Sequence, residues 1–456
     1  MLSIFWEHFD FVLYFCYNKI VIHIKCPNNQ SNSMYFNRAK KRIIKEYDIV
    51  RTILHSDLNN FYASVEVLKH PEYKDCPLVV CGSVEDRHGI VLAKNQIAKE
   101  YGIKTGDVLW EARQKCRNIV AVEVDHNSYE VMSKKVRQIY SRFTDHIEAF
   151  GIDECWLDIT DSIKNFGTGE EIAEQIRQTI KSELGLTVSI GVSFNKVFAK
   201  LGSDMRKPDA ITVINKSNFK QMVWPLPAEE LLFVGKSAKK KLNSIGIYTI
   251  GDIANTDIKV LDSMLGVWGE TFHRYANGLD DSPVVDKPEE VKSISNSLTY
   301  YRDLVNFDQV KTLILMLAES IASRLRESGI GKANTVKITI TDNTLQTYAK
   351  QVKLLHPTSS AVDIANGAYG LFEGLYRWDK PVRAVGVSVC DFTFNEEQLF
   401  FDDTTIKHGK QDKLDKAIDD IRKKYGNSSM KRARILQDKK LSQTEIKGDP
   451  FFKNPK

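Results

Sequence analysis

The sequence predicts a multidomain α+β protein in which two modules of βαββαβ order flank a helical middle region. Short β-branched runs alternate with longer segments of helical spacing, and this order of strands and helices occurs twice. Length supports the same class, because 456 residues correspond to about three or four domains of ordinary size. We therefore expect two ferredoxin-like sheets in one chain.

The first module begins near residue 47. Its expected elements are a strand over 47–57, a helix over 60–70, two strands within 145–160, a helix over 170–184 and a strand over 186–194. Pro71 cannot continue the first helix and ends it. In an antiparallel sheet of this order the first strand lies beside the hairpin, so the end of 50–57 should meet the hairpin turn.

The second module repeats this order near the C-terminus. Its expected elements are a strand over 292–300, a helix over 307–328, strands over 334–341 and 346–355, a helix over 360–377 and a strand over 382–392. The first of these strands alternates small hydroxyl side chains with larger ones. This pattern suits close approach to a phosphate backbone, and it equally suits a half-buried edge strand.

Between the modules, residues 231–254 predict two helices joined by a glycine turn. Four lysines, Lys236, Lys239, Lys240 and Lys241, lie at the start of the second helix. Backbone N–H groups at such a start can bind a phosphate without reading sequence. A lysine run is more often a solvated face, so both interpretations stay open.

The two ends of the chain predict appendages. Residues 1–24 are apolar but interrupted by charged side chains, with no basic region before them, so we expect neither a membrane span nor a signal peptide. We expect an extension over 1–46, with Met34 as an alternative start, and a basic C-terminal tail over 396–456. One helical stripe in the tail is formed by Leu414, Ile418, Ile421 and Tyr425. It either caps the second module or remains mobile.

Composition favours a cytoplasmic protein, and we further expect a monomer. The 64 Lys and Arg against 59 Asp and Glu give a net charge of only +5, so any nucleic-acid surface must come from local clustering. The seven cysteines include no C-x-x-C pair, which favours reduced thiols over disulfides or a zinc site.

Three carboxylates give the strongest chemical signal. Asp57 ends the first strand, and Asp153 and Glu154 lie at the hairpin turn, so the sheet order brings distant acids together. Without a cation such acids would raise one another's pKa values. Magnesium fits best, because it prefers hard oxygen ligands and substrate phosphates, and two such ions support in-line phosphoryl displacement. Each acid alone is more simply explained as a turn residue, whereas the set favours the metal site.

Four separated segments resemble one known family. They are ILHSDLNNFYASVE (53–66), GIDECWLDIT (151–160), SIGVSFNKVFAKLGSDMRKPDA (189–210) and GIYTIGDIA (246–254). In this order they resemble the Y-family translesion DNA polymerases, most closely the bacterial DNA polymerase IV group. The resemblance runs from about residue 50 to residue 395.

The resemblance implies a right-hand polymerase. Its expected parts are a palm over 47–70 and 141–215, small fingers over 71–140, a helix-hairpin-helix thumb over 216–288 and a little finger over 289–395. It further implies that Asp57, Asp153 and Glu154 are palm carboxylates that bind two Mg²⁺ ions, with the Leu58 carbonyl as a further ligand.

The same resemblance implies a nucleotide site. Tyr62 matches the steric-gate position, where a ring against the sugar excludes a 2′-hydroxyl, and Phe61 and Lys99 are further expected contacts of the nucleotide. Lys207 matches a lysine that pairs with the incoming triphosphate, where a cation offsets phosphate charge. The ordinary interpretations are a core aromatic residue and a solvated lysine.

The chain departs from the family in several places. Gln96 and Lys99 stand where many relatives have a Tyr and an Arg that touch phosphates, and Lys cannot copy the planar fork of Arg. Asn60 stands at a position that is aromatic in some relatives, and Phe233 replaces the usual first glycine of the thumb hairpin. The expected DNA contacts in the thumb are Gly235, Lys236, Lys239 and Lys240.

Together these observations predict a template-directed, low-fidelity DNA polymerase for lesion bypass. The expected partners are primer-template DNA, deoxynucleoside triphosphates and a sliding clamp, because EEQLFFDD (396–403) resembles the family's clamp-binding peptide in compressed form. Small fingers should check the nascent pair weakly, and no segment is left over for a proofreading nuclease. Two alternatives stay open: a catalytically silent DNA-binding scaffold of the same fold, and a nucleotidyl cyclase, which uses a similar palm but needs no second sheet domain.

Overall fold

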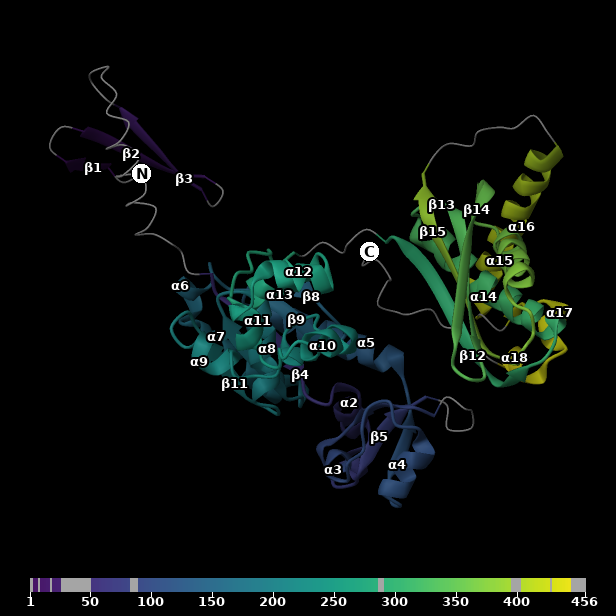
Figure 1. Cartoon of the computed structure of the whole chain (residues 1–456), viewed down its shortest axis with the longest axis horizontal. Coiled ribbons are helices and arrows are strands. Elements are labelled where there is room, and N and C mark those ends of the chain that lie inside the picture. The colour runs from purple at the N-terminus through teal and green to yellow at the C-terminus, as the bar shows by residue number, and fades with distance from the viewer. Residues whose placement is uncertain are drawn as a thin grey trace. The chain divides into compact units, whose positions relative to one another are not determined.

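The computed structural model describes residues 51–82, 89–285, 291–394, 403–426 and 429–443, together with three N-terminal strands (Figure 1). The chain divides into two compact units, Met1–Val50 and Arg51–Lys456. In the first unit, β1 (Ser3–Trp6), β2 (Phe9–Cys16) and β3 (Lys19–Lys25) form an antiparallel sheet in that order.

The first module of the second unit is built on a sheet of order β11-β10-β4-β9-β8. Its strands are β4 (Ile53–Leu58), β8 (Ile147–Ala149), β9 (Glu154–Asp158), β10 (Val188–Ser193) and β11 (Ile211–Ile214). The central strand β4 pairs antiparallel with β9 on one side and with β10 on the other. The predicted neighbourhood of the first strand and the hairpin is therefore confirmed.

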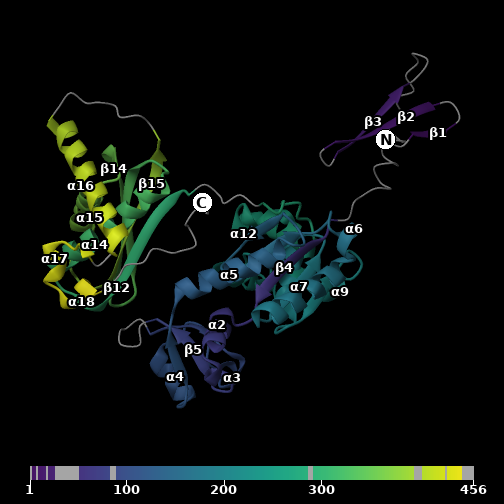
Figure 2. The ribbon, with the colours of Figure 1, turned by 180° about the vertical axis from the view of Figure 1, so that it is seen from behind.

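Helices cover both faces of this sheet: Figure 2 labels α5 and α7, and Figure 1 labels α8. On one face, Leu54 of β4 packs in a core with α5 (His126–Tyr140) and α7 (Gly169–Leu184). On the other face, Ile53 packs with Ala199 of α8 (Lys196–Met205). Helix α7 begins at a capping box of Thr168 and Glu171, which satisfies backbone donors at its start. Helix α6 (Ile163–Phe166) precedes it.

A small sheet is inserted between α2 (Phe61–Lys69) and α5. Its order is β6-β5-β7, and its elements are β5 (Leu78–Cys81), β6 (Val91–Lys94), β7 (Val120–Glu123), α3 (Gln96–Glu100), α4 (Leu109–Lys115) and the 3₁₀ helix η1 (Pro71–Tyr73). Val79, Val91 and Ala98 lie in its own small core. This insertion therefore has a separate centre of packing.

The middle region is helical, as predicted from its spacing. Its helices are α9 (Phe219–Val223), η2 (Ala228–Glu230), α10 (Lys236–Asn243), α11 (Ile250–Asn255), α12 (Ile258–Leu265) and α13 (Trp268–Ala276). Phe198 and Leu201 of α8 join the core of these helices, so α8 packs on the first sheet and on the middle region at once.

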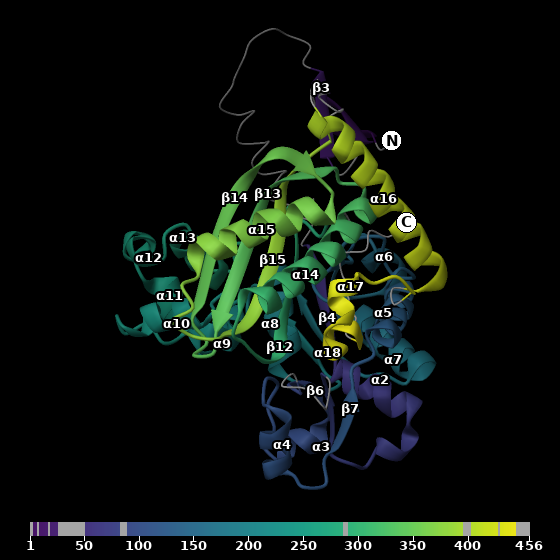
Figure 3. The ribbon, with the colours of Figure 1, turned by 90° about the vertical axis from the view of Figure 1, so that its right-hand side faces the viewer.

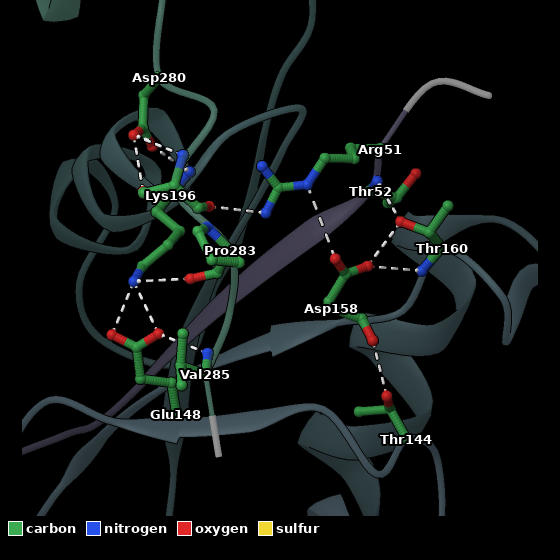
Figure 4. A network of polar contacts seen from close by, with 11 residues as sticks. Arg51, Thr52, Thr144, Glu148, Asp158, Thr160, Lys196, Asp280, Pro283 and Val285 are labelled. Atoms are coloured by element: carbon green, nitrogen blue, oxygen red, sulfur yellow. Dashed lines mark hydrogen bonds and ion pairs between the residues drawn. The ribbon is translucent and has the colours of Figure 1, made fainter. Parts of the chain in front are cut away.

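A polar network ties the segment after α13 to the first sheet (Figure 4). Lys196 Nζ donates to both oxygens of Glu148 at 2.6 and 2.7 Å, and the Val285 backbone N–H donates to Glu148 Oε2 at 2.8 Å. Arg51 donates to the Ser282 carbonyl at 2.9 Å. These contacts therefore hold the segment that follows α13 along the edge of the first sheet.

The second module is an antiparallel sheet of order β12-β15-β13-β14 with two long helices against it (Figure 3). Its elements are β12 (Ser293–Leu304), α14 (Phe307–Ser328), β13 (Lys332–Asp342), β14 (Thr347–Thr358), α15 (Ala361–Leu375) and β15 (Val382–Thr393). The order βαββαβ predicted for this region is confirmed.

Three C-terminal helices, α16 (Asp403–Tyr425), α17 (Ala433–Leu436) and α18 (Lys439–Gln443), follow this module. Helix α16 contacts α14 through charges, since Arg422 donates to Glu319 at 3.0 Å. Of the apolar stripe that was a candidate cap, Leu414 and Tyr425 are 52% and 66% exposed. Ile435 of α17 is buried in the module's core. No helix in the described part of the chain is long and apolar enough to cross a membrane.

Candidate active site

The three predicted carboxylates meet where β4 ends and β9 begins. Asp57 and Glu154 stand directly opposite one another in the β4–β9 ladder, and the Leu58 backbone N–H donates to the Asp153 carbonyl at 3.0 Å. Sequence positions 57 and 153 are thus joined by strand pairing. The structure brings Asp57, Asp153 and Glu154 to one corner of the sheet.

Two lysines from the α8 side reach this corner. Lys207 Nζ lies 2.7 Å from Asp57 Oδ2, and Lys200 Nζ lies 2.8 Å from Glu154 Oε2 and 3.9 Å from Asp57 Oδ2. Asp204 contacts both ammonium groups, at 2.8 Å from Lys207 and 3.4 Å from Lys200. The acids are therefore balanced by cations of the protein itself.

Burial sets the electrostatics of the corner. Desolvation raises the pKa of Asp57 to about 7, although Lys207 opposes the shift. Desolvation and the neighbouring Glu154 also raise the pKa of Asp153. Burial alone would raise the pKa of Glu154 too, but His55 and Lys200 outweigh it and that pKa is lowered. The corner thus concentrates negative charge that costs free energy to bury unless cations accompany it.

The donor set fits a hard divalent cation. Carboxylate oxygens and a backbone carbonyl are the ligands that Mg²⁺ prefers, and Asp57 and Asp153 have raised pKa values that a cation would lower. Within the described ranges no three His, Cys, Asp or Glu side chains already stand at metal-ligand spacing. Lys207 takes the contact with Asp57 Oδ2 that a cation would use.

The two aromatic residues that follow Asp57, Phe61 and Tyr62, have different surroundings. Phe61 is 3% exposed and packs in the core between the sheet and α5, so its ring does not face a ligand. Tyr62 is half-buried and stacks on Tyr129 of α5, with ring centroids 4.2 Å apart. Asn60 begins α2 with φ +48, a left-handed conformation that Asn adopts more readily than an aromatic residue.

The remaining predicted residues lie outside this corner. Gln96 and Lys99 are exposed on α3, in the small inserted sheet. Gly235 is the N-cap of α10, whose first turn carries Lys236 and Lys239, and Lys239 pairs with Glu229. A hollow of about 690 Å³ beside this helix is lined by Glu229, Glu230, Val234, Gly235, Lys236, Lys239, Lys240 and Asn243.

The segment expected to bind a sliding clamp lies almost wholly outside the described residues: within 396–403, only the backbone of Asp403 is described.

Two family models match the chain. The impB/mucB/samB family matches residues 56–204, and its C-terminal domain matches residues 291–399. The DNA polymerase IV of Acetivibrio thermocellus is 52% identical over 398 residues, which cover 86% of this chain and 99% of that protein. The chain belongs to the DNA polymerase IV group of the Y-family DNA polymerases.

Further relatives agree with this Y-family assignment. The DNA polymerase IV of Clostridium acetobutylicum is 36% identical over 396 residues, covering 85% of this chain and 98% of that protein. A solved structure of a Y-family DNA polymerase chimera matches with a TM-score of 0.66 and 26% identity, covering 75% of this chain and all of that one. The predicted family, fold class and enzyme class, a DNA-directed lesion-bypass polymerase, are confirmed, and the cyclase and silent-scaffold alternatives are set aside.

Sequence reasoning missed several side chains of this polymerase site. Lys200 lies in the quoted segment 189–210, seven residues before Lys207, but only Lys200 belongs to α8, which ends at Met205. His55 lies two residues before Asp57, and strand alternation places both on one face. Tyr129 carried no comparable signal, because its partner Tyr62 is far away in the sequence.

Proposed function

We propose that this Y-family polymerase adds deoxynucleotides to a primer 3′ end with Asp57, Asp153, Glu154 and the Leu58 carbonyl as ligands of two Mg²⁺ ions. The observation that carries the proposal is the pairing of Asp57 with Glu154 beside Asp153. When bound, such ions activate the primer hydroxyl and neutralise the transferring phosphates. DNA polymerases of this group generally use divalent metal ions, and this supports the proposal.

The lysines then have separate tasks. Lys207 now balances Asp57 at 2.7 Å, and its ammonium group is the one that we assign to the incoming triphosphate once Asp57 binds a cation. Lys200 stays with Glu154 and keeps that carboxylate ionised. We assign Lys99 to the same triphosphate, although Lys offers a point charge and not the bidentate fork of Arg.

We assign sugar selection to Tyr62. Its ring stacks on the ring of Tyr129. Tyr62 is the second residue of α2, the helix that follows Asp57 in the chain. A ring in this place would contact C2′ of a deoxyribose and clash with a ribose hydroxyl. Phe61 contributes by packing beneath α2, since its buried ring cannot reach a nucleotide.

The proposed parts and partners follow the polymerase fold. They are a palm over 47–70 and 141–215, fingers over 71–140, a thumb over 216–288, a little finger over 289–395, DNA phosphate contacts from Gly235, Lys236, Lys239 and Lys240, and a sliding clamp bound through 396–403. We propose that the enzyme works as a cytoplasmic monomer on primer-template DNA. The small three-stranded insertion encloses little of a nascent pair, which supports low fidelity.

Primer extension with Mg²⁺ tests the metal assignment. We expect Asp153→Ala to reduce extension by roughly 10²-fold or more, because the acid would help to hold the ions that stabilise the transition state. The matched control is Asp161→Ala, an exposed acid eight positions along the same chain segment, which should extend normally. A gel shift with the same duplex should be unchanged in both variants. Normal extension by Asp153→Ala would refute the assignment.

A further inference from the structure

His55 is a buried polar side chain next to the three acids. It lies on β4, two residues before Asp57, and is 0% exposed. Its ring meets Trp156 of β9 edge-on, with centroids 5.2 Å apart and planes at 64°. Burying an imidazole is unfavourable unless both of its nitrogens have hydrogen-bond partners, so a ring in this place requires a partner for each nitrogen.

The two nitrogens of His55 face two different elements. Nδ1 lies 2.8 Å from Ser203 Oγ on α8, and Nε2 lies 3.5 Å from Glu154 Oε2 on β9. One rigid ring therefore spans the distance from α8 to a proposed metal ligand. Any change in the position of Ser203 would be transmitted to the side of the ring that faces Glu154.

Ser203 is itself fixed by close backbone packing. A Cβ atom at Gly191 of β10 would lie 1.9 Å from the Ala199 carbonyl oxygen and 2.5 Å from the Ser203 nitrogen. Gly202 likewise lies against Gly191, where its Cβ would stand 3.2 Å from the Cα of that residue. Only glycine permits this approach, so α8 rests directly on the strand and Ser203 cannot drift from His55.

The protons can be arranged in two ways. Ser203 Oγ also lies 2.7 Å from the Lys200 carbonyl, to which its hydroxyl can donate. In that case a neutral ring carries its proton on Nδ1, and Nε2 faces Glu154 Oε2 acceptor to acceptor, which leaves the buried Nε2 without a hydrogen-bond partner in the described chain. If the hydroxyl donates to Nδ1 instead, the ring proton sits on Nε2 and points at Glu154. The second arrangement satisfies Nε2 and gives Glu154 Oε2 a second donor beside Lys200.

We propose that His55, oriented by Ser203, is a positioning residue that fixes the Glu154 carboxylate for binding a divalent cation. The inference rests on the proposed function, because it assumes that Glu154 is a metal ligand. Partners of this kind hold a ligand in its binding orientation, and their loss costs roughly 10–100-fold in metal affinity. Lys200 approaches the same Oε2 from α8 at 2.8 Å, so His55 and Lys200 together restrict the carboxylate.

Two amide substitutions separate the two ends of the ring. The amide of His55→Gln reaches about as far as Nε2 and can donate to Glu154, whereas the amide of His55→Asn reaches only as far as Nδ1 and can bond Ser203 alone. We expect Mn²⁺ binding to the protein without DNA or nucleotide, followed by the electron paramagnetic resonance signal of free Mn²⁺, to weaken roughly 10-fold or more in His55→Asn and to recover in His55→Gln. Ser203→Ala should weaken binding to a smaller extent.

The reference variant is Glu154→Gln, and thermal unfolding reports the folding of each variant. If Glu154→Gln weakens Mn²⁺ binding and His55→Asn does not, the inference is overturned while the proposed function stands. If Glu154→Gln binds Mn²⁺ as the wild type does, the metal assignment itself fails. Should His55→Asn not fold, Ser203→Ala decides the matter: weakened binding supports the positioning role, and unchanged binding overturns it.

Discussion

Tyr62 lies flat against Tyr129, and the stack extends through hydrogen bonds into the interior. The ring planes differ by 13°, and Tyr129 is fully buried. The Tyr129 hydroxyl donates to Glu66 Oε1 at 2.8 Å, and Lys69 Nζ donates to the same oxygen at 3.2 Å. The sugar selection proposed for Tyr62 requires a ring that keeps its position, and the buried Tyr129, whose hydroxyl is hydrogen-bonded, holds it there.

Replacing Tyr129 should weaken sugar selection without touching the acids. Stacked aromatic pairs contribute about 0.5–1.5 kcal/mol, so Tyr129→Leu should lower the preference for deoxynucleotides over ribonucleotides by roughly 2- to 10-fold. Tyr129→Phe keeps the stack and should keep the preference, while leaving Glu66 without its hydroxyl donor and lowering stability by about 1–3 kcal/mol. The ratio of kcat/KM for the two nucleotides is the measurement.

Tyr62→Ala is the reference for this prediction and should lose most of the preference. An unchanged ratio in Tyr129→Leu would show that Tyr62 is held by other contacts. Loss of preference in Tyr129→Phe as well would place the effect in the hydrogen bond to Glu66 and not in the stack.

Individual residues of the site were predictable where strand order alone decides their neighbours. Asp57 and Glu154 are register partners because β4 and β9 pair antiparallel, which follows from the order of elements. Phe61 was predicted at the nucleotide, but its ring lies in the core because it points to the α5 side of α2. His55 and Lys200 were not predicted, since their contacts depend on how closely α8 approaches the sheet.

At the scale of elements, the approach of α8 to β10 is the packing contact on which the site depends most. Helix α8 carries Lys200 and Ser203, and it covers the face of the sheet that bears Asp57 and Glu154. Gly191 makes the contact possible because the atoms nearest to a side chain there belong to the backbone of α8. Backbone atoms cannot rotate away as the end of a long side chain can.

Gly191→Ala should therefore be strongly destabilising. The added methyl group would overlap the Ala199 carbonyl, so we expect a loss of about 1–3 kcal/mol or more, together with weaker Mn²⁺ binding as α8 lifts. Gly370→Ala on α15 is the control: nothing lies within 4 Å of its Cβ, and alanine should stabilise that helix by about 0.5–1 kcal/mol. Urea unfolding followed by circular dichroism measures both, and equal stability of Gly191→Ala and the wild type would contradict the packing account.

The bounds of the helices and strands were predicted well where the hydrophobic periodicity is strong. The packing partner of a helix was predicted poorly. The strand expected over 346–355 is observed as Thr347–Thr358, and the helix expected over 307–328 is Phe307–Ser328. For α16 the sequence left open whether its apolar stripe caps the module or remains mobile, and the structure shows ionic contacts to α14: Asp419 accepts from Arg326 at 2.6 Å. Sequence periodicity shows that a stripe exists and does not show which side meets a partner.

At the scale of the whole molecule, the chain must pass from the helical middle region to the second sheet module. Residues 280–285 make this exit along the first sheet, where Val284 packs with Ile53 and Trp156. Asp280 Oδ2 accepts from the Lys196 backbone N–H at 3.2 Å, at the start of α8. The exit segment is thus attached to the helix and the strand that carry the site (Figure 4).

Glu148 is the residue whose removal should loosen this exit most. Its carboxylate accepts two bonds from Lys196, whose side chain is only 12% exposed, and one from the Val285 backbone. Hydrogen bonds to charged groups contribute about 1.5–3 kcal/mol, so Glu148→Ala should speed hydrogen exchange in 280–285 by roughly 10- to 100-fold and leave α14 unchanged. Glu148→Gln can still accept from Val285 and should show an intermediate rate. Unchanged exchange in Glu148→Ala would mean that Asp280 and the buried Val284 suffice to fix the segment, and that the ionic contacts only accompany them.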